Sequence, residues 1–252
     1  MLGLAYTRAV RQLIEELEHR EMAHLQALGE RMAEGVQSGH VIHLYDNGHM
    51  LNHEMFNRAG GLALLARLDV GQPTVANSAV RPKAAGLKAN PSAVAGDDLD
   101  MALARYVVDR SAAMAGDDLI IGSVSGRSPL VVELALGARE RGIRTVALTA
   151  LKYARTLPAR HVSGKLLYQV TDDVIDIGTE AGDAALTVEG LPEKLAPTSG
   201  IMAAVAMWAL EAAIAEALLK RGITPTVFRS VNYPDGPERL DAAKRRYETL
   251  GY

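Results

Sequence analysis

The sequence predicts an α/β fold built on a doubly wound, five-stranded parallel sheet of the flavodoxin-like type. Short apolar runs alternate with helical patterns along most of the 252 residues. Several runs, such as Leu119-Ile120-Ile121, are apolar throughout, which is typical of parallel strands covered by helices on both faces. The length suits one large domain, so residues 1–252 are expected to fold as a single unit.

The first quarter of the chain predicts a helical segment and two strands. Residues 1–38 form one long amphipathic helix or a helix pair, because Leu and Met recur at helical spacing among dense Glu and Arg. His40–Tyr45 is the first strand candidate. Met50–Arg58 follows a turn and predicts a helix, and Leu62–Val70 supplies a short strand.

Residues 71–96 carry three prolines and almost no hydrophobic periodicity. A stretch of this length without its own secondary structure is usually a lid, a binding loop or a disordered segment. Arg81, Lys83 and Lys88 give it positive charge. We expect a mobile flap that closes over an anionic ligand.

The remaining elements follow in regular alternation. A strand at Asp118–Gly122 leads through a small polar turn into a helix that begins near Pro129, a residue suited to a first helical turn. Further strands are expected at Thr145–Thr149 and Asp173–Ile177. Further helices are expected at Asp97–Ala115, Ser199–Arg221 and Gly236–Leu250. The helix at Ser199–Arg221 and the helical segment at the N-terminus are long, and the helix at Gly236–Leu250 closes the chain.

Composition excludes several classes of protein. The chain has no cysteine, which excludes disulfides, thiolate metal sites and thiol catalysis. A net charge of −3 gives no broad basic surface for nucleic acid. Ile201–Leu219 comes closest to a membrane span, but Glu211 and Glu216 interrupt it, and no signal-peptide core follows Met1. The sequence predicts a cytoplasmic protein without nucleic-acid or membrane partners.

The first candidate site is the strand-to-helix turn Ser123–Ser128, which reads SVSGRS. Backbone N–H groups at a helix start, together with the helix dipole, favour an anion, and serine hydroxyls add donors. Ser and Gly also suit plain helix capping, so the turn fits a phosphate or sulfonate cradle and a structural turn equally well. The candidate binding residues here are Ser123, Ser125, Arg127, Ser128 and Thr149.

A second polar group follows the first strand, at the same edge of the predicted sheet. Asn47 and Gly48 form a turn before a segment that displays His49, His53 and Glu54. The two histidines are four residues apart and share one face of the predicted helix. A carboxylate and imidazoles beside a sugar suit proton abstraction next to a carbonyl. The same side chains could instead bind a divalent metal or form an ordinary polar surface.

A third group lies further along the chain. Asp183 and Glu189 are either alternative catalytic carboxylates or caps of the long helix that begins at Ser199. Thr198 and Ser199 fit a simple N-cap, although a helix start that faces the cleft would also bind substrate. His161 lies in a loop rather than on an apolar face, so a buried structural role is not expected for it.

The serine turn resembles the phosphosugar loop of the sugar isomerase (SIS) family, and three more stretches resemble its UPF0309 branch. These stretches read NGHMLNHEMFNRAGGL, RHVSGKLLYQVTDDVIDIGTEAGDAAL and EGLPEKLAPTSG, and their order is that of the family. The resemblance covers roughly residues 5–245. It implies an αβα sandwich, a homodimer in which helices of both subunits line the cleft, and binding of a sugar phosphate.

The chain departs from that branch after the first strand. Where the branch shows Gly-Ser-Gly-His-Ser, this chain has Asp46-Asn47-Gly48-His49-Met50, without either serine. A loop with an aspartate is less favourable for a dianion, so the sugar is either phosphorylated, sulfonated or free. The well-studied isomerases place a catalytic Glu on the helix after the first strand at a different offset, and Glu54 matches it approximately.

Three functions fit these residues. The first is an aldose–ketose isomerase that works through an enediol, with Glu54 as the base, His49 or His53 moving the second proton and His161 contributing from the facing side. The second is a non-catalytic sugar-phosphate sensor. The third is a lyase or etherase that acts on an amino-sugar phosphate. No cofactor is expected.

Overall fold

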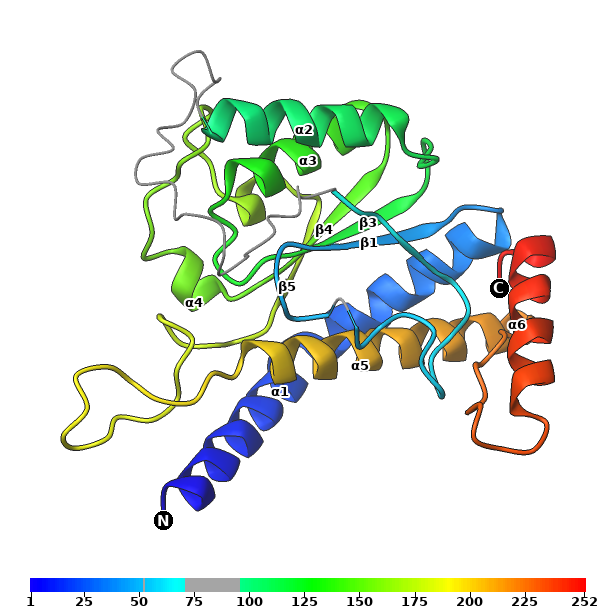
Figure 1. The fold of residues 1–252 in the computed structure, drawn as a ribbon. Coiled ribbons are helices and arrows are strands. Elements are labelled where there is room, and N and C mark those ends of the chain that lie inside the picture. The colour runs from blue at the N-terminus through cyan, green and yellow to red at the C-terminus, as the bar shows by residue number, and fades with distance from the viewer. Residues whose placement is uncertain (52, 71–95) are drawn as a thin grey trace, which may run out of the picture.

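The computed structural model describes residues 1–51, 53–70 and 96–252. Its centre is a sheet of five parallel strands in the order β2-β1-β3-β4-β5 (Figure 1). This is the order of flavodoxin-like doubly wound sheets, so the predicted fold class is confirmed. The strands are β1 (Ile42–Asp46), β2 (Leu65–Arg67), β3 (Asp118–Gly122), β4 (Arg144–Thr149) and β5 (Asp173–Asp176).

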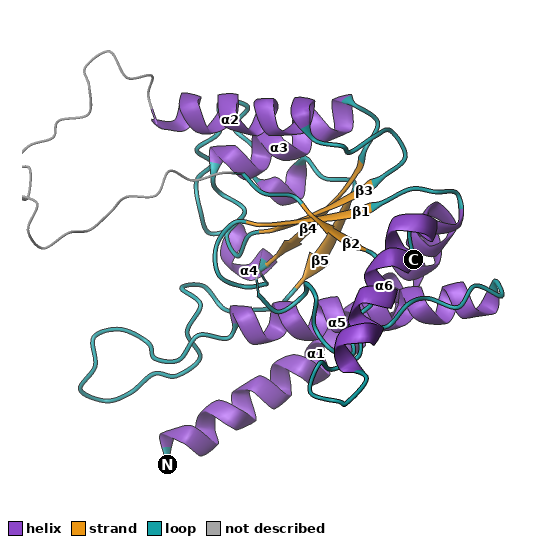
Figure 2. Cartoon of the chain, turned by 45° about the vertical axis from the view of Figure 1, so that its right-hand side comes forward, coloured by secondary structure: helices purple, strands orange, loops and turns teal. Residues whose placement is uncertain are grey.

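Helices cover both faces of the sheet, as Figures 1 and 2 show. On one face α2 (Gly96–Arg110) packs on α3 (Pro129–Glu140), and on the other α1 (Leu2–Gln37) packs along α5 (Ser199–Lys220). Every residue of β1 and β3 is buried, as strands between two helical layers must be. The shorter elements are α4 (Leu151–Ala154), the 3₁₀ turn η1 (Leu167–Gln169) and α6 (Gly236–Leu250).

The N-terminal segment is one helix rather than a pair, and it crosses α5 at short range. Gly29 lies at the crossing, where an added Cβ would come within 2.7 Å of the Ala213 Cβ. Within the described part of the chain, α5 alone has the length and hydropathy of a membrane span. However, 56% of the apolar 18-residue stretch in this helix is buried inside the protein, which is typical of a core helix.

An ionic network joins α1 to the edge of the sheet where β3, β4 and β5 begin. Arg31 contacts Asp118 at 2.6 Å and Asp173 at 2.9 Å, and Arg144 contacts Asp118 at 3.2 Å. Burial raises the pKa of the Asp118 carboxyl, while the two guanidinium groups oppose that shift. Asp118 is almost fully buried, so its carboxylate has lost its hydration by water. The two guanidinium groups replace that hydration with ion pairs.

One predicted element is wrong. The described residues of Met50–Arg58 form turns and bends rather than a helix. The N–H of Met55 does reach the Leu51 carbonyl at 3.3 Å, but Asn57 has a left-handed backbone with φ of 55° and ends the turn. The flap expected at residues 71–96 lies outside the described residues, apart from Gly96, which begins α2.

Candidate functional site

The strand order reverses between β1 and β3, and the carboxyl ends of these strands lie side by side. Asp46 is in register with Gly122, and the N–H of Asn47 donates to the Gly122 carbonyl at 2.8 Å. From there the chain continues from β1 to β2 on one side and from β3 to β4 on the other. Ligands of doubly wound sheets bind where the two loops diverge in this way.

The loop Ser123–Ser128 follows β3, and internal bonds fix its backbone. Ser123 is buried, and its Oγ accepts the N–H of Gly126 at 3.2 Å. Gly126 has φ of 58°, a left-handed conformation that suits glycine. Thr149 donates its hydroxyl to the Val124 carbonyl at 3.0 Å, so the side chain of Thr149 supports the loop from β4.

Ser128 holds the N-cap position of α3, but its side chain makes no capping bond. In ordinary capping this hydroxyl would accept an N–H of the first helical turn. Ser125 and Ser128 are half-buried, and neither hydroxyl has a hydrogen-bond partner among the residues that the structure describes. Arg127 donates its Nε to the Pro158 carbonyl at 2.9 Å. The α3 N-terminus therefore has two serine hydroxyls and first-turn N–H groups available for an anion.

The ends of β1 and β2 are acidic by contrast. Burial raises the pKa of the Tyr45 hydroxyl to about 12, and the nearby carboxylates of Asp46, Asp100 and Asp69 add to the shift. One edge of the sheet thus has hydroxyl and N–H donors after β3 and carboxylate acceptors after β1 and β2. A hollow of about 310 Å³ on the acidic side is lined by Tyr45, Asp46, Asn47, Gly48, Leu68, Asp69 and Val70.

The candidate proton-transfer residues after β1 form no cluster. His49 and His53 are exposed. Glu54 is half-buried and contacts α5, where Trp208 Nε1 donates to its Oε1 at 3.2 Å, and Arg58 pairs with its Oε2 at 3.0 Å. Within the described ranges no group of three His, Asp or Glu side chains could hold a metal ion. The geometry therefore gives no support to the metal alternative.

His161 is buried, contrary to the expectation from its loop position. Its Nδ1 lies 2.8 Å from Ser163 Oγ, and its Nε2 lies 2.7 Å from Glu133 Oε2 on α3. Glu133 also pairs with Arg105 on α2. One partner is a near neighbour in the sequence and the other comes from α3, and together they satisfy both ring nitrogens of His161. Its role in proton transfer stays a prediction.

Asp183 caps α5, which is the structural one of its two predicted roles. Its Oδ1 accepts the N–H groups of Thr198 at 3.1 Å and Ser199 at 2.8 Å, and its Oδ2 accepts the Ser199 hydroxyl at 2.5 Å. Thr198 and Ser199 are both buried at this helix start. Glu189 is exposed in the loop before α5.

Sequence reasoning missed Glu211 as a residue of interest. It is buried on α5, and its Oε2 accepts the N–H of Leu62 at 2.9 Å. Its Oε1 has no hydrogen-bond partner in the described part of the chain, and burial raises the pKa of this carboxyl to about 7. The available signal was an acidic residue inside an otherwise apolar helix, since Glu is rarely buried without a partner.

The model of the SIS domain family matches residues 5–150, which is more than half of the chain. This chain belongs to the SIS domain family. The matched region includes β1, β3, β4 and the Ser123–Ser128 loop, so the resemblance carried by that loop is confirmed at the level of the family.

Known relatives of this SIS domain protein belong to the UPF0309 group. A UPF0309 protein of Streptomyces coelicolor is 37% identical over 228 residues, which are 90% of this chain and 87% of that protein. A UPF0309 protein of Geobacillus thermodenitrificans is 31% identical over 244 residues, with 96% and 92% of the two chains covered. The SIS domain protein is therefore a UPF0309 family member, as its three other stretches predicted.

Solved structures resemble the fold more distantly. Phosphoheptose isomerase GmhA from Neisseria gonorrhoeae has a TM-score of 0.48 at 16% identity, over 86% of this chain and 96% of that chain. The Vibrio vulnificus NanR protein complexed with ManNAc-6P has a TM-score of 0.46 at 13% identity, over 99% and 70%. Similarity at this level does not identify a ligand for this chain.

Proposed function

We propose that this SIS domain protein binds an anionic sugar, such as a sugar phosphate, at the carboxyl edge of its sheet and isomerises it between aldose and ketose. The observation that carries the proposal is Ser128, which occupies the N-cap of α3 without capping it. A bound anion would accept the hydroxyl and N–H groups that the helix start leaves without internal partners.

The two sides of the site suit the two parts of such a ligand. The phosphate accepts hydrogen bonds from Ser125, Ser128 and the first turn of α3, where the helix dipole favours negative charge. The sugar hydroxyls donate to the exposed carboxylate of Asp69, while the Asp46 carboxylate, which accepts the N–H of Leu51 at 2.8 Å, adds negative charge to this side. Because these carboxylates repel a dianion, the anionic group is expected only on the α3 side.

Isomerisation through an enediol needs two proton transfers. A base takes the proton from C2 of the aldose and returns it to C1, while a second group moves the O2 proton to O1. We assign Glu54 to the first role and His49 or His53 to the second, because a carboxylate can take a proton from carbon and an imidazole can both accept and donate a proton between oxygens. His161 from the facing side is the alternative for the second role. Substrate binding must then displace Trp208 or Arg58 from Glu54.

A non-catalytic sugar-phosphate sensor is the second candidate. It is favoured by the engagement of Glu54 with Trp208 and Arg58, because a sensor needs the anion site but no free base. A lyase or etherase would need the same cleft and a base, and would use Glu54 in the same way as the isomerase.

Proton exchange separates the enzyme from the sensor. The purified protein is incubated in D₂O with a panel of sugars and their phosphates, and deuterium at C2 is followed by NMR. For an isomerase we expect incorporation that falls by at least about 100-fold in Glu54→Gln, with sugar-phosphate binding retained. Full activity in that variant would remove Glu54 as the base. Binding without exchange for every sugar would establish the sensor.

The anion site is tested by Ser125→Ala and Ser128→Ala. Each variant removes one hydroxyl, and we expect binding of the preferred sugar phosphate to weaken by roughly 1–3 kcal/mol, the contribution of a hydrogen bond to a charged group. Isothermal titration calorimetry measures the change. Ser38→Ala, at the exposed end of α1, is the matched control and should bind as the wild type does. Unchanged affinity in both site variants would contradict the proposal.

A further inference from the structure

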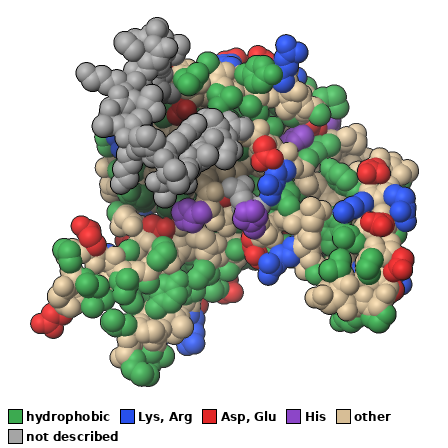
Figure 3. Space-filling view, in the orientation of Figure 1, with side chains coloured by type: hydrophobic (Ala, Val, Ile, Leu, Met, Phe, Trp, Pro, Cys, Tyr) green, Lys and Arg blue, Asp and Glu red, His purple; other side chains and the backbone are tan. Residues whose placement is uncertain are grey.

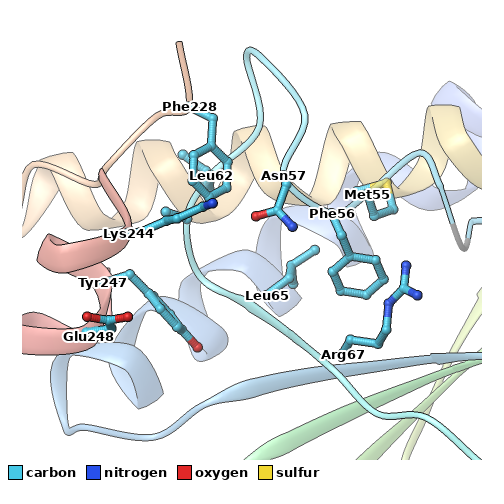
Figure 4. A pocket seen from close by; sticks show the side chains of 11 residues that line it. Met55, Phe56, Asn57, Leu62, Leu65, Arg67, Phe228, Lys244, Tyr247 and Glu248 are labelled. Carbon is cyan, nitrogen blue, oxygen red and sulfur yellow. The ribbon is translucent and has the colours of Figure 1, made fainter. Parts of the chain in front are cut away.

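A second pocket, of about 610 Å³, lies between α6, β2 and the turns that precede β2 (Figure 4). It shares no residue with the Ser123–Ser128 loop or with the acidic hollow at the end of β1. Its volume falls in the range of small-molecule sites in proteins. The pocket is lined by Met55, Phe56, Asn57, Leu62, Ala63, Leu65, Arg67, Phe228, Lys244, Tyr247 and Glu248.

Three aromatic side chains line this pocket. Phe56, Phe228 and Tyr247 come from three separate segments of the chain and surround the space together with Leu62 and Leu65 (Figure 4). Rings at several angles around one space favour a planar apolar body that can stack on one ring and meet another edge-on.

Cationic and amide donors converge on the same space. Figure 4 shows the ammonium of Lys244 and the side-chain amide of Asn57 beside the pocket, with the amide oxygen on the side of Lys244 and the amide nitrogen on the side of Phe56. Neither side chain has a hydrogen bond or ion pair with the described residues of the chain. Arg67 lies at the far side with its guanidinium 4.6 Å from the centre of the Phe56 ring. Against these two cations the lining has one carboxylate, Glu248, so its formal charge is positive.

We propose that this pocket is a second ligand site, which binds a small aromatic carboxylate. The carboxylate of the ligand accepts a charge-assisted hydrogen bond from the Lys244 ammonium and a further hydrogen bond from Nδ2 of Asn57. The ring of the ligand occupies the space between Phe56, Phe228 and Tyr247. A monoanion matches the single ammonium of Lys244. The site is independent of the proposed sugar chemistry, because none of its lining residues has a role there.

Trp208 provides an internal reporter for this site. It is the single tryptophan of the chain, and its ring lies 3.1 Å from the position that a Cβ on Gly61 would occupy, one residue before the wall residue Leu62. Its Nε1 donates to Glu54, which directly precedes the wall residues Met55 and Phe56. A ligand that orders this wall therefore changes the surroundings of the indole.

Benzoate and its neutral analogue benzamide test the proposal with the purified full chain. We expect benzoate to produce a saturable change in Trp208 fluorescence and a saturation-transfer NMR signal, and benzamide to bind at least about fivefold more weakly. Lys244→Gln should weaken benzoate binding about tenfold, the loss expected for one charge-assisted hydrogen bond. Asn57→Gly should also weaken it, because glycine keeps the left-handed backbone while removing the amide.

Arg245→Gln is the matched control, since Arg245 is the exposed neighbour on α6 and lies outside the lining. It should bind benzoate as the wild type does. The proposal is overturned if benzoate gives neither a saturable fluorescence change nor an NMR signal at millimolar concentration. It is also overturned if Arg245→Gln loses as much affinity as Lys244→Gln, because the attraction would then be a general effect of charge. Circular dichroism of each variant confirms that it is folded.

Discussion

Asp183 accepts three hydrogen bonds from the start of α5, two from the N–H groups of Thr198 and Ser199 and one from the Ser199 hydroxyl. Its backbone is left-handed, with φ of 53°. Asp and Asn tolerate this conformation better than most L-residues. Both the hydrogen bonds of the side chain and the left-handed backbone therefore favour Asp at this position. Neither of these requirements involves a ligand.

Substitutions at Asp183 separate these two restrictions. Asp183→Ala should lower the free energy of unfolding by about 1–3 kcal/mol, because it leaves the α5 start uncapped and puts a Cβ in a left-handed residue. Asp183→Gly should cost about 1 kcal/mol less than Asp183→Ala, since it removes only the cap. Asp183→Asn keeps an acceptor oxygen and should cost least. Urea unfolding checks this order. If all three variants were as stable as the wild type, the cap would contribute nothing to stability.

The buried carboxyl of Glu211 makes stability depend on pH. Burial raises its pKa in the folded protein from 4.5 to about 7, while the N–H of Leu62 opposes the shift. The folded state then binds more protons than the unfolded state between these values. Stability is therefore highest below the unfolded pKa and falls as the pH rises through the folded pKa.

Glu211→Gln removes this titration and keeps an acceptor for Leu62. Relative to the variant, the wild type should lose about 1–3 kcal/mol of unfolding free energy between pH 4.5 and 8. Denaturant titrations at several pH values measure the difference. Glu216→Gln, an exposed site on the same helix, should not reproduce this loss. Parallel pH profiles of wild type and Glu211→Gln would mean that the carboxyl releases no proton on unfolding, so that folding does not raise its pKa.

Among the elements, the contact of α1 with α5 depends on the absence of a side chain at Gly29. An added Cβ would lie 2.7 Å from the Ala213 Cβ and 2.9 Å from its carbonyl carbon, closer than real Cβ atoms come. Alanine has the better helix propensity, by up to about 1 kcal/mol. At this position the steric overlap outweighs that preference, because the two helices must separate to relieve it.

Gly29→Ala should therefore lower the free energy of unfolding by about 1–3 kcal/mol. Gly3→Ala in the same helix is the matched control, since nothing lies within 4 Å of its added Cβ. This control should leave stability unchanged or raise it by up to about 1 kcal/mol. Thermal unfolding of the two variants gives the comparison, and a stabilised Gly29→Ala would show that the helices can move apart at no cost.

For the whole molecule, exposed apolar side chains gather at the end of the molecule that contains the N-terminus. In Figure 3 hydrophobic side chains form a broad area at the lower left, over the first turns of α1 and the loop before α5. Tyr6 ties these two segments together, because its hydroxyl donates to the Pro197 carbonyl at 2.8 Å. The exposed residues in these segments include Leu2, Leu4, Leu191 and Leu195, and Ile201 follows in the first turn of α5.

We expect this surface to form the homodimer interface that the family resemblance implies, because contiguous apolar surface of this kind marks an interaction site. Light scattering at micromolar concentration should give the mass of a dimer. Leu4→Glu and Leu195→Glu should shift the mass toward the monomer. Leu250→Glu alters an equally exposed leucine at the C-terminal end and should not. A monomeric wild type would contradict the prediction.

The sequence by itself determined the architecture of this protein. The strand at Asp118–Gly122 and the helix at Gly236–Leu250 have the bounds that their local patterns predict. The other predicted strands and helices differ by a few residues at their ends, except the helix predicted at Met50–Arg58, which does not form, and the short α4 and η1 were not predicted. The serine turn of the candidate site was also visible. These features depend on near neighbours in the chain, namely apolar runs, helical spacing, proline and glycine, so a local pattern is enough to predict them.

Only the tertiary structure decided which polar side chains are engaged by the protein. The buried His161 is bound by Glu133, Asp183 is bound by the start of α5, and Glu54 is bound by Trp208, in each case through a partner that is not a neighbour in the sequence. The left-handed turn at Asn57 replaced a predicted helix, and the second pocket joins residues 55–67 to residues 228–248. Long-range packing brings such groups together. It therefore decides whether a polar side chain is bonded to the protein itself or remains available to a ligand, and local spacing in the sequence does not.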